Sequence, residues 1–93
     1  MLLTEVFHHI KCDKIYKPDK KNLKVNYVFT NSLNVKKSSI FVIDSKVKFR
    51  RKYVKEAISR GAIAILTNKY LDNINVTQYI VSNIYLSLST LLY

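Results

Sequence analysis

Two uninterrupted apolar runs, joined by a basic segment of helical pattern, constrain the fold of this chain more than any other feature. The runs occupy residues 40–43 and 62–66, and continuous runs of this kind are typical of strands that are covered on both faces of a parallel sheet. Residues 39–66 therefore predict a strand, a helix and a parallel strand in a right-handed crossover. The predicted helix carries one apolar stripe, formed by Tyr53, Val54, Ala57, Ile58 and Gly61.

Gly61 is the only glycine of the chain, and it follows the predicted helix directly. A helix often ends at a residue with a left-handed backbone conformation, which glycine adopts without the steric cost that other residues meet. We therefore expect Gly61 to have a positive φ and to end the helix.

Shorter apolar patterns on both sides of this central unit predict the remaining strands and helices. Residues 25–29 and 79–81 are rich in β-branched and aromatic side chains, as strands are. Residues 2–10 and 84–92 carry apolar side chains at helical spacing, as the central segment near 50–60 does. The expected fold class is α/β, with a small mixed, mostly parallel sheet of about four strands and flanking helices.

The stretches between these elements are predicted to be connections. Residues 11–22 are polar and contain a Pro-Asp turn signal, and residues 68–77 form a second polar connector. Residues 30–32 are small and polar, so they end the first strand of the sheet and offer groups that can bind the backbone or a ligand. Ser82 or Asn83 can cap the last helix.

Length and composition fit one small globular domain. The chain has 93 residues, of which 48% are hydrophobic, and this is enough for one modest core. Its lone cysteine, Cys12, excludes an internal disulfide and fits a cytoplasmic protein. No apolar run reaches the roughly 18 residues of a membrane span. The last predicted helix ends abruptly on residues 91–93, so we expect residues 1–93 to be the N-terminal domain of a longer chain.

The formal net charge of +10 raises the alternative of a small basic nucleic-acid-binding module. Such a module would use Arg50, Arg51, Lys52 and Lys55. The lysines are scattered along the chain instead of gathered on one element, and the joint richness in Lys, Asn, Ile and Tyr is expected from an A+T-rich genome. Nucleic-acid binding is therefore the second interpretation of this sequence.

The sequence lacks the common motifs of catalytic sites. A chain with one glycine holds neither a GxxxxGK[ST] loop nor a GxGxxG turn. There is no HExxH, no CxxC and no paired-carboxylate spacing, and His8 and His9 are adjacent, so helical i, i+4 spacing does not place both on one metal. We therefore expect a binding or positioning role and no catalysis by this chain alone.

Two segments resemble motifs of one enzyme family. Residues 30–42 read TNSLNVKKSSIFV, which is similar to the motif T-x-D-S-R-x-V-x-P-G-D-L-F-V-A in the N-terminal domain of Mur ligases, the amide ligases of peptidoglycan precursors. Residues 53–66 read YVKEAISRGAIAIL, which resembles F-I-x-x-A-I-x-x-G-A-x-A-I-V of the same domain. Residues 1–7 and 79–92 are compatible with it, so the resemblance covers most of the chain.

The resemblance implies both a fold and a function. In Mur ligases this domain is a small α/β unit that holds the uridine-diphosphate end of the substrate, whereas ATP and Mg²⁺ are used by a downstream P-loop domain and the amino acid by a C-terminal domain. The family member most similar to this chain is the tripeptide-forming ligase that adds diaminopimelate or lysine to UDP-MurNAc-L-Ala-D-Glu. The implied parent protein is an ATP-dependent acid–amino-acid ligase of the bacterial cytoplasm, active in cell-wall biogenesis, cell shape and cell division.

The resemblance also implies which residues bind the substrate. Ser32 is the ligand-side residue that matches the family motif, and its neighbours Thr30 and Asn31 are expected to add backbone groups. Lys46 and Arg50 are expected to attract the diphosphate. Five motif positions differ, because the family's Asp is Asn31, its Arg is a leucine, and its Pro-Gly-Asp turn is KSS at residues 37–39.

Overall fold

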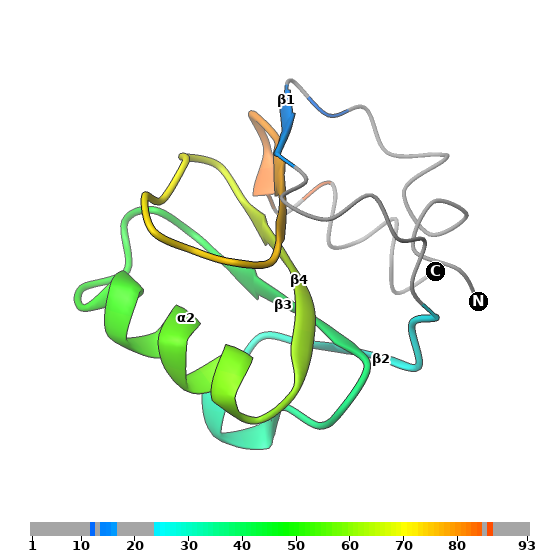
Figure 1. Cartoon of the computed structure of the whole chain (residues 1–93). Coiled ribbons are helices and arrows are strands. Elements are labelled where there is room, and N and C mark those ends of the chain that lie inside the picture. The colour runs from blue at the N-terminus through cyan, green and yellow to red at the C-terminus, as the bar shows by residue number, and fades with distance from the viewer. Residues whose placement is uncertain (1–11, 13, 17–23, 85, 87–93) are drawn as a thin grey trace.

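The molecule, described from a computed structural model, is built around one five-stranded sheet with the strand order β1-β5-β4-β3-β2 (Figure 1). The structure describes residues 12, 14–16, 24–84 and 86. The elements are β1 (Lys14–Tyr16), β2 (Tyr27–Phe29), the 3-10 helix η1 (Ser32–Asn34), β3 (Ser39–Ile43), α2 (Arg50–Ser59), β4 (Ala62–Thr67) and β5 (Thr77–Ile80). Strands β2, β3, β4 and β5 pair in parallel, and β1 pairs antiparallel to β5. The predicted α/β class with a mixed, mostly parallel sheet is confirmed.

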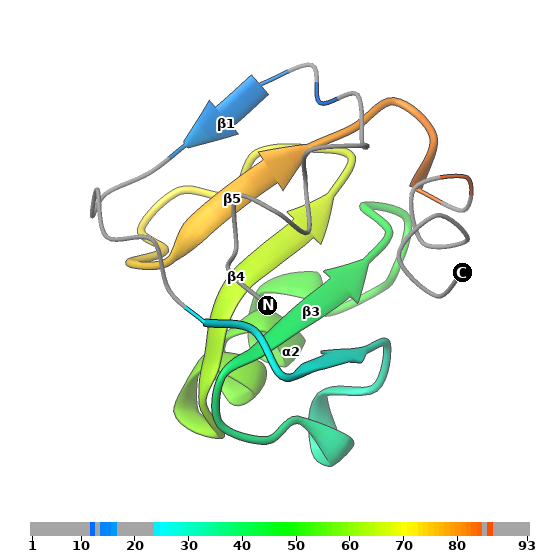
Figure 2. The ribbon, with the colours of Figure 1, turned by 90° about the vertical axis from the view of Figure 1, so that its right-hand side faces the viewer.

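The central crossover is confirmed as well. Strands β3 and β4 are parallel neighbours, and helix α2, which connects them, lies against one face of both strands (Figures 1 and 2). Val54 and Ala57 of the predicted apolar stripe are fully buried, whereas Tyr53 remains 37% exposed. The helix therefore packs through its middle, and its first turn reaches the molecular surface.

The apolar runs bury both of their faces, as continuous runs in a parallel sheet should. Phe41 and Ile43 of β3 point to the side of α2, where they pack with Val54 and Ala57. Ile40 and Val42 point to the opposite side. The cluster on that opposite side contains Val25, Ile40, Val42, Ala64, Leu66, Tyr79, Val81 and Ile84.

The sheet has one strand more than predicted. Lys14–Tyr16, expected inside a polar connection, forms β1 at the edge of the sheet and pairs with residues 78–80. Sequence periodicity misses it because the strand has three residues and is half-exposed, so its apolar signal is small. The predicted strand 25–29 is shorter than expected, and the predicted strand 79–81 begins earlier, at Thr77.

The two terminal helices were predicted in parts of the chain that are largely outside the described residues. The helix at 2–10 lies wholly outside them, and so does most of the helix at 84–92. Ile84 and Leu86 are helical, and the side-chain oxygen of Asn83 accepts a hydrogen bond of 3.0 Å from the backbone N–H of Leu86. Asn83 is thus the residue that caps this segment, one of the two that were predicted to do so.

Gly61 has the predicted positive φ, with a value of +113°, which is wider than the about +57° of the left-handed helical region. A second constraint was not visible in the sequence. A Cβ at this position would lie 2.6 Å from the Cα of Lys37, and the N–H of Ser38 donates to the Gly61 carbonyl at 3.1 Å. Glycine is required here by backbone conformation and by the close approach of the 37–38 turn.

No helix among the described residues is both long enough and apolar enough to cross a membrane.

Candidate functional site

A pocket opens at the carboxyl edge of the sheet, where β2 and β3 diverge. The pairing of β2 with β3 covers residues 39–41 of β3, although β3 continues to Ile43. After Phe29 the chain turns away into η1, and the gap beside the end of β3 becomes a pocket of about 490 Å³. Ligands of open parallel sheets bind at this edge, outside the carboxyl ends of the strands.

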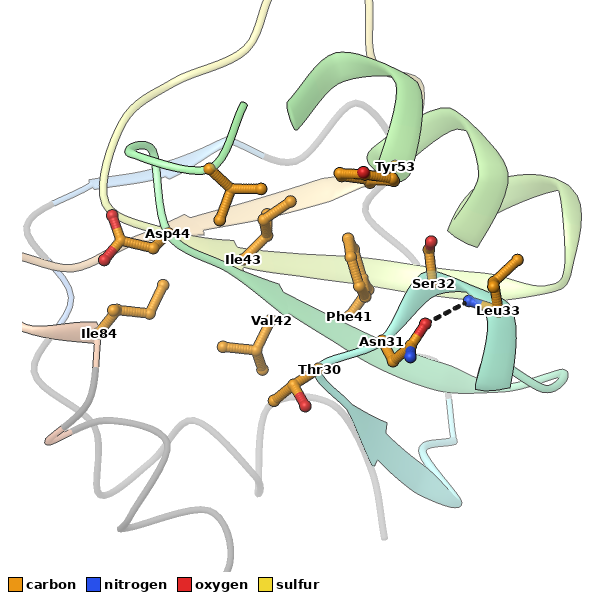
Figure 3. A pocket seen from close by; sticks show the side chains of 11 residues that line it. Thr30, Asn31, Ser32, Leu33, Phe41, Val42, Ile43, Asp44, Tyr53 and Ile84 are labelled. Atoms are coloured by element: carbon orange, nitrogen blue, oxygen red, sulfur yellow. Dashed lines mark hydrogen bonds between the residues drawn. The ribbon is translucent and has the colours of Figure 1, made fainter. Parts of the chain in front are cut away.

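The pocket has apolar walls with a few polar groups (Figure 3). Phe41 and Ile43 of β3 line it on the side of α2 and Val42 lines it on the opposite side of the sheet, while Tyr53 from the first turn of α2 closes one side. The complete lining is Thr30, Asn31, Ser32, Leu33, Phe41, Val42, Ile43, Asp44, Val47, Tyr53 and Ile84. Apolar walls with a small number of orienting polar groups are characteristic of sites for small organic ligands.

The turn after β2 presents Ser32 to the pocket. Asn31 precedes η1 and caps it, because its side-chain oxygen accepts a hydrogen bond of 2.9 Å from the N–H of Leu33 (Figure 3). Ser32 is 6% exposed, and its hydroxyl makes no hydrogen bond within the described part of the chain. Since Asn31 closes the turn, the Ser32 hydroxyl is available to a ligand in the pocket.

The loop after β3 forms the opposite wall. Asp44 accepts a hydrogen bond of 2.9 Å from the N–H of Lys46 on one carboxylate oxygen, and the N–H of Val47 donates to the Asp44 carbonyl at 3.1 Å. These bonds fold residues 44–47 into a tight turn whose first and last side chains line the pocket. Asp44 is the sole charged residue among the described residues that line it.

The structure brings together three of the five residues that were predicted to bind substrate. Thr30, Asn31 and Ser32 all line the pocket, whereas Lys46 and Arg50 do not. Lys46 lies in the loop beside the pocket with an exposed side chain. A role in binding remains a prediction for all five residues.

Arg50 already makes hydrogen bonds within the chain. One guanidinium nitrogen donates to the carbonyl of Lys69 at 3.0 Å and lies 3.4 Å from the hydroxyl of Thr67. Burial lowers the pKa of Arg50, the nearby charge of Arg51 lowers it further, and Asp44 opposes the change. Arg50 therefore ties the start of α2 to the connection after β4, next to the pocket wall.

The cationic cluster of the nucleic-acid alternative is partly engaged in the same way. Arg51 donates a hydrogen bond of 2.6 Å to the carbonyl of Asp72. Two of the four cations proposed for that module therefore donate hydrogen bonds to backbone carbonyls elsewhere in the chain. Lys52 and Lys55 remain on the exposed face of α2. This arrangement gives the two arginines a structural role and favours the pocket as the functional site.

Several pocket residues were not predicted from the sequence. Tyr53 was expected to pack in the helix stripe, and Ile84 in the stripe of the last helix. Their place in the pocket depends on where α2 starts and where the chain leaves β5, which is long-range geometry. Asp44 and Val47 belong to the loop that follows β3, and they lie at the carboxyl edge of the sheet, where ligands of parallel sheets bind.

The arrangement is suited to binding a small organic ligand. The polar groups around the pocket can orient a ligand through hydrogen bonds, and the apolar walls can cover a ring. Within the described residues, no group of three His, Cys, Asp or Glu side chains is placed to hold a metal ion.

The fold is found in solved structures of MurF ligases. Crystal structure II of MurF from Acinetobacter baumannii matches with a TM-score of 0.61 at 16% identity, over 78% of this chain and 16% of that chain. A structure of UDP-N-acetylmuramoylalanyl-D-glutamyl-2,6-diaminopimelate–D-alanyl-D-alanyl ligase from the same organism matches with a TM-score of 0.60 at 15% identity, over 77% and 16% of the two chains. Crystal structure I of MurF from Acinetobacter baumannii matches with a TM-score of 0.61 at 15% identity, over 77% of this chain and 16% of that chain.

The sequence comparisons add no closer assignment, since no protein-family model and no curated protein matches the chain. At 15–16% identity the structural likeness shows a shared fold. The chain has the fold of one part of these ligases and spans 16% of their length.

Proposed function

We propose that this chain is a substrate-docking domain of the Mur ligase type, whose pocket binds the uridine-diphosphate end of a UDP-MurNAc peptide. Ser32 carries this proposal. It matches the family motif at a ligand-side position, it is buried at the carboxyl edge of the sheet, and its hydroxyl is available to a ligand. The fold shared with the MurF structures supports the same role.

The ligand's polar contacts would come from the turn after β2. The Ser32 hydroxyl donates to a phosphate or uracil oxygen, and backbone groups of Thr30 and Asn31 add further hydrogen bonds. The ring of the nucleoside packs on the apolar wall beside Phe41 and Tyr53. Such hydrogen bonds contribute about 0.5–1.5 kcal/mol each with a neutral partner and about 1.5–3 kcal/mol with a charged one.

The diphosphate would lie at the mouth of the apolar pocket, toward the cations near the loop after β3. Lys46 is exposed beside the pocket, and Arg50 stands at the start of α2. Their attraction for a phosphate acts through solvent, so it weakens as the ionic strength rises.

The wider biological role follows from the same likeness. We propose that the domain acts with downstream ligase domains of one longer chain, which bind ATP and Mg²⁺ and carry out amide formation in the bacterial cytoplasm. The tripeptide-forming ligase, which adds diaminopimelate or lysine, is the proposed type of parent enzyme because Ser32 stands where the D-Ala-D-Ala-adding ligase has threonine. The product serves peptidoglycan synthesis, and through it cell shape and division.

A titration followed by NMR tests the binding role. The ¹⁵N-labelled chain is titrated with UDP, with neutral uridine and with a short oligothymidylate, each at low and at physiological salt. We expect UDP to shift the amide signals of residues 30–33 and 44–50, with uridine shifting the first group alone. An oligonucleotide that binds more tightly than UDP, with shifts spread over the lysines, would contradict the proposal and favour the nucleic-acid alternative.

A further inference from the structure

Asn68 lies outside the pocket but holds one of its walls. Its side-chain oxygen accepts a hydrogen bond of 2.7 Å from the N–H of Ser45, and its side-chain nitrogen donates to the Asp44 carboxylate at 3.1 Å. The carboxylate oxygen that Asn68 contacts is the one that accepts from the N–H of Lys46 at 2.9 Å. One amide side chain therefore fixes two successive residues of the loop after β3.

The sheet explains why a residue so far along the chain reaches this loop. Ile43 and Thr67 are paired at the ends of the parallel strands β3 and β4, so the next residues, Asp44 and Asn68, emerge side by side. An amide can accept from the backbone and donate to a carboxylate at once, which an ionised aspartate and an alanine cannot do. Asn68 is half-buried, so water competes poorly for these bonds.

The consequence concerns the pocket wall made by Asp44 and Val47. Both side chains line the pocket, and both belong to the turn of residues 44–47 that Asn68 anchors. We infer that Asn68 is a positioning residue that holds this turn against the pocket and thereby sets the affinity for the nucleotide. This inference rests on the proposed function.

The test compares the parent chain with Asn68→Ala. We expect the Asn68→Ala variant to bind UDP roughly 3- to 10-fold more weakly, the range that the loss of ordinary hydrogen bonds gives. The backbone amide of Ser45 should also exchange faster with deuterium, because it loses its acceptor. Asn75→Ala, an exposed asparagine of the same connector, should change neither quantity.

A second control separates positioning from general stability. Ile80→Val removes one methylene from a buried residue of β5 that does not line the pocket, and such changes typically lower stability without disturbing the fold. It should lower the melting temperature and leave the dissociation constant for UDP unchanged.

Rescue by an exchanged pair makes the test specific. In the double variant Asp44→Asn/Asn68→Asp, the side chain at 68 can accept hydrogen bonds from the N–H of Ser45 and from the side-chain amide at 44. Both contacts can therefore form again, with the negative charge now on the residue that follows β4 instead of the residue that follows β3. We expect the Ser45 exchange rate to recover toward the parent value, whereas Asn68→Asp alone places two carboxylates together and should not recover.

The outcomes distinguish the two claims. If the parent binds UDP and Asn68→Ala binds it equally well, the inference is wrong and the proposed function stands. If UDP shifts no signal of the parent, the proposed function is wrong. An unchanged Ser45 exchange rate in Asn68→Ala overturns the positioning role whether or not UDP binds.

Discussion

The side-chain amide of Gln78 makes both of its hydrogen bonds with the backbone of Leu71. Its oxygen accepts from the Leu71 N–H at 3.0 Å, and its nitrogen donates to the Leu71 carbonyl at 2.8 Å. Gln78 is 2% exposed, and Leu71 is buried as well. The side chain of Gln78 in β5 thus supplies the two hydrogen bonds that a neighbouring strand would otherwise give to the backbone of Leu71, in the connection between β4 and β5.

Replacing Gln78 by leucine should therefore be costly. Gln78→Leu keeps a similar volume but leaves the buried N–H and carbonyl of Leu71 without partners, and each such group costs about 1–3 kcal/mol. We expect a loss of about 2–4 kcal/mol in the free energy of unfolding, measured by urea denaturation. Asn75→Leu, at an exposed site of the same connector, should stay within about 0.5 kcal/mol. Equal stability of the two variants would contradict the role given to Gln78.

Gly61→Val should destabilise the fold by more than about 2 kcal/mol. A β-branched residue is penalised at positive φ, and its Cβ would meet the backbone of Lys37. Gly61→Ala should already cost most of this energy because the Cβ is the clashing atom. Chemical denaturation of both variants is the measurement, and parent-like stability of Gly61→Ala would show that the 37–38 turn moves away freely.

Ser38→Gly should stabilise the fold. Ser38 has φ of +60°, which costs a non-glycine residue about 1–2 kcal/mol. Glycine avoids this cost, but it loses more backbone entropy on folding than serine, which offsets part of the gain in stability. We expect a net gain of roughly 0.5–1 kcal/mol. The neighbouring change Ser39→Gly should destabilise, because Ser39 is fully buried and its hydroxyl donates to the Lys36 carbonyl at 2.6 Å. The same sign for both variants would rule out the conformational explanation.

Stability should fall at high pH through Tyr79. Burial raises the pKa of Tyr79 to about 12, with a smaller contribution from Cys12, whereas an unfolded tyrosine titrates near about 10. Below about pH 10 both states hold the proton and the stabilisation is complete. Above it the unfolded chain loses the proton first, so the free energy of unfolding decreases as the pH rises toward about 12.

Tyr79→Phe isolates this effect from the titration of the lysines, which both proteins share. Urea denaturation at about pH 9 and about pH 11.5 should show a steeper loss in the parent than in Tyr79→Phe. At about 1.4 kcal/mol per pKa unit, the extra loss of unfolding free energy in the parent approaches about 2–3 kcal/mol when Tyr79 is fully deprotonated in both states. Parallel losses in the two proteins would mean that Tyr79 does not titrate differently in the folded state.

The local patterns of the sequence predict the centre of the fold well. The apolar runs of β3 and β4 and the stripe of α2 each specify one element, and their parallel pairing follows from continuous burial. The turn at residues 37–39, where the chain differs from the resembled motif, is informative as well. Ser38 has a positive φ at the position where that motif has glycine. The backbone there is set by the packing of the 37–38 turn on Gly61.

Other features depend on contacts between distant residues and leave no local signal. Strand β1 exists because β5 offers it an edge. Arg50 looks like a free cation in the sequence, but the connection after β4 lies close enough to accept its hydrogen bonds. Asn68 reaches Asp44 through strand register, and none of these pairings has a characteristic spacing in the chain.

The most direct measurement is the affinity of Ser32→Ala for UDP, compared by NMR titration with the parent and with Ser59→Ala. Ser59 is an exposed serine at the far end of α2, and its hydroxyl donates to a helix carbonyl. We expect UDP to shift the amide signals of residues 30–33 in the parent and in Ser59→Ala, with equal dissociation constants. In Ser32→Ala, binding should be weaker by about 0.5–1.5 kcal/mol, or by up to about 3 kcal/mol if a phosphate is the partner. Equal binding by all three proteins, or shifts that avoid the pocket, would contradict the docking role of Ser32.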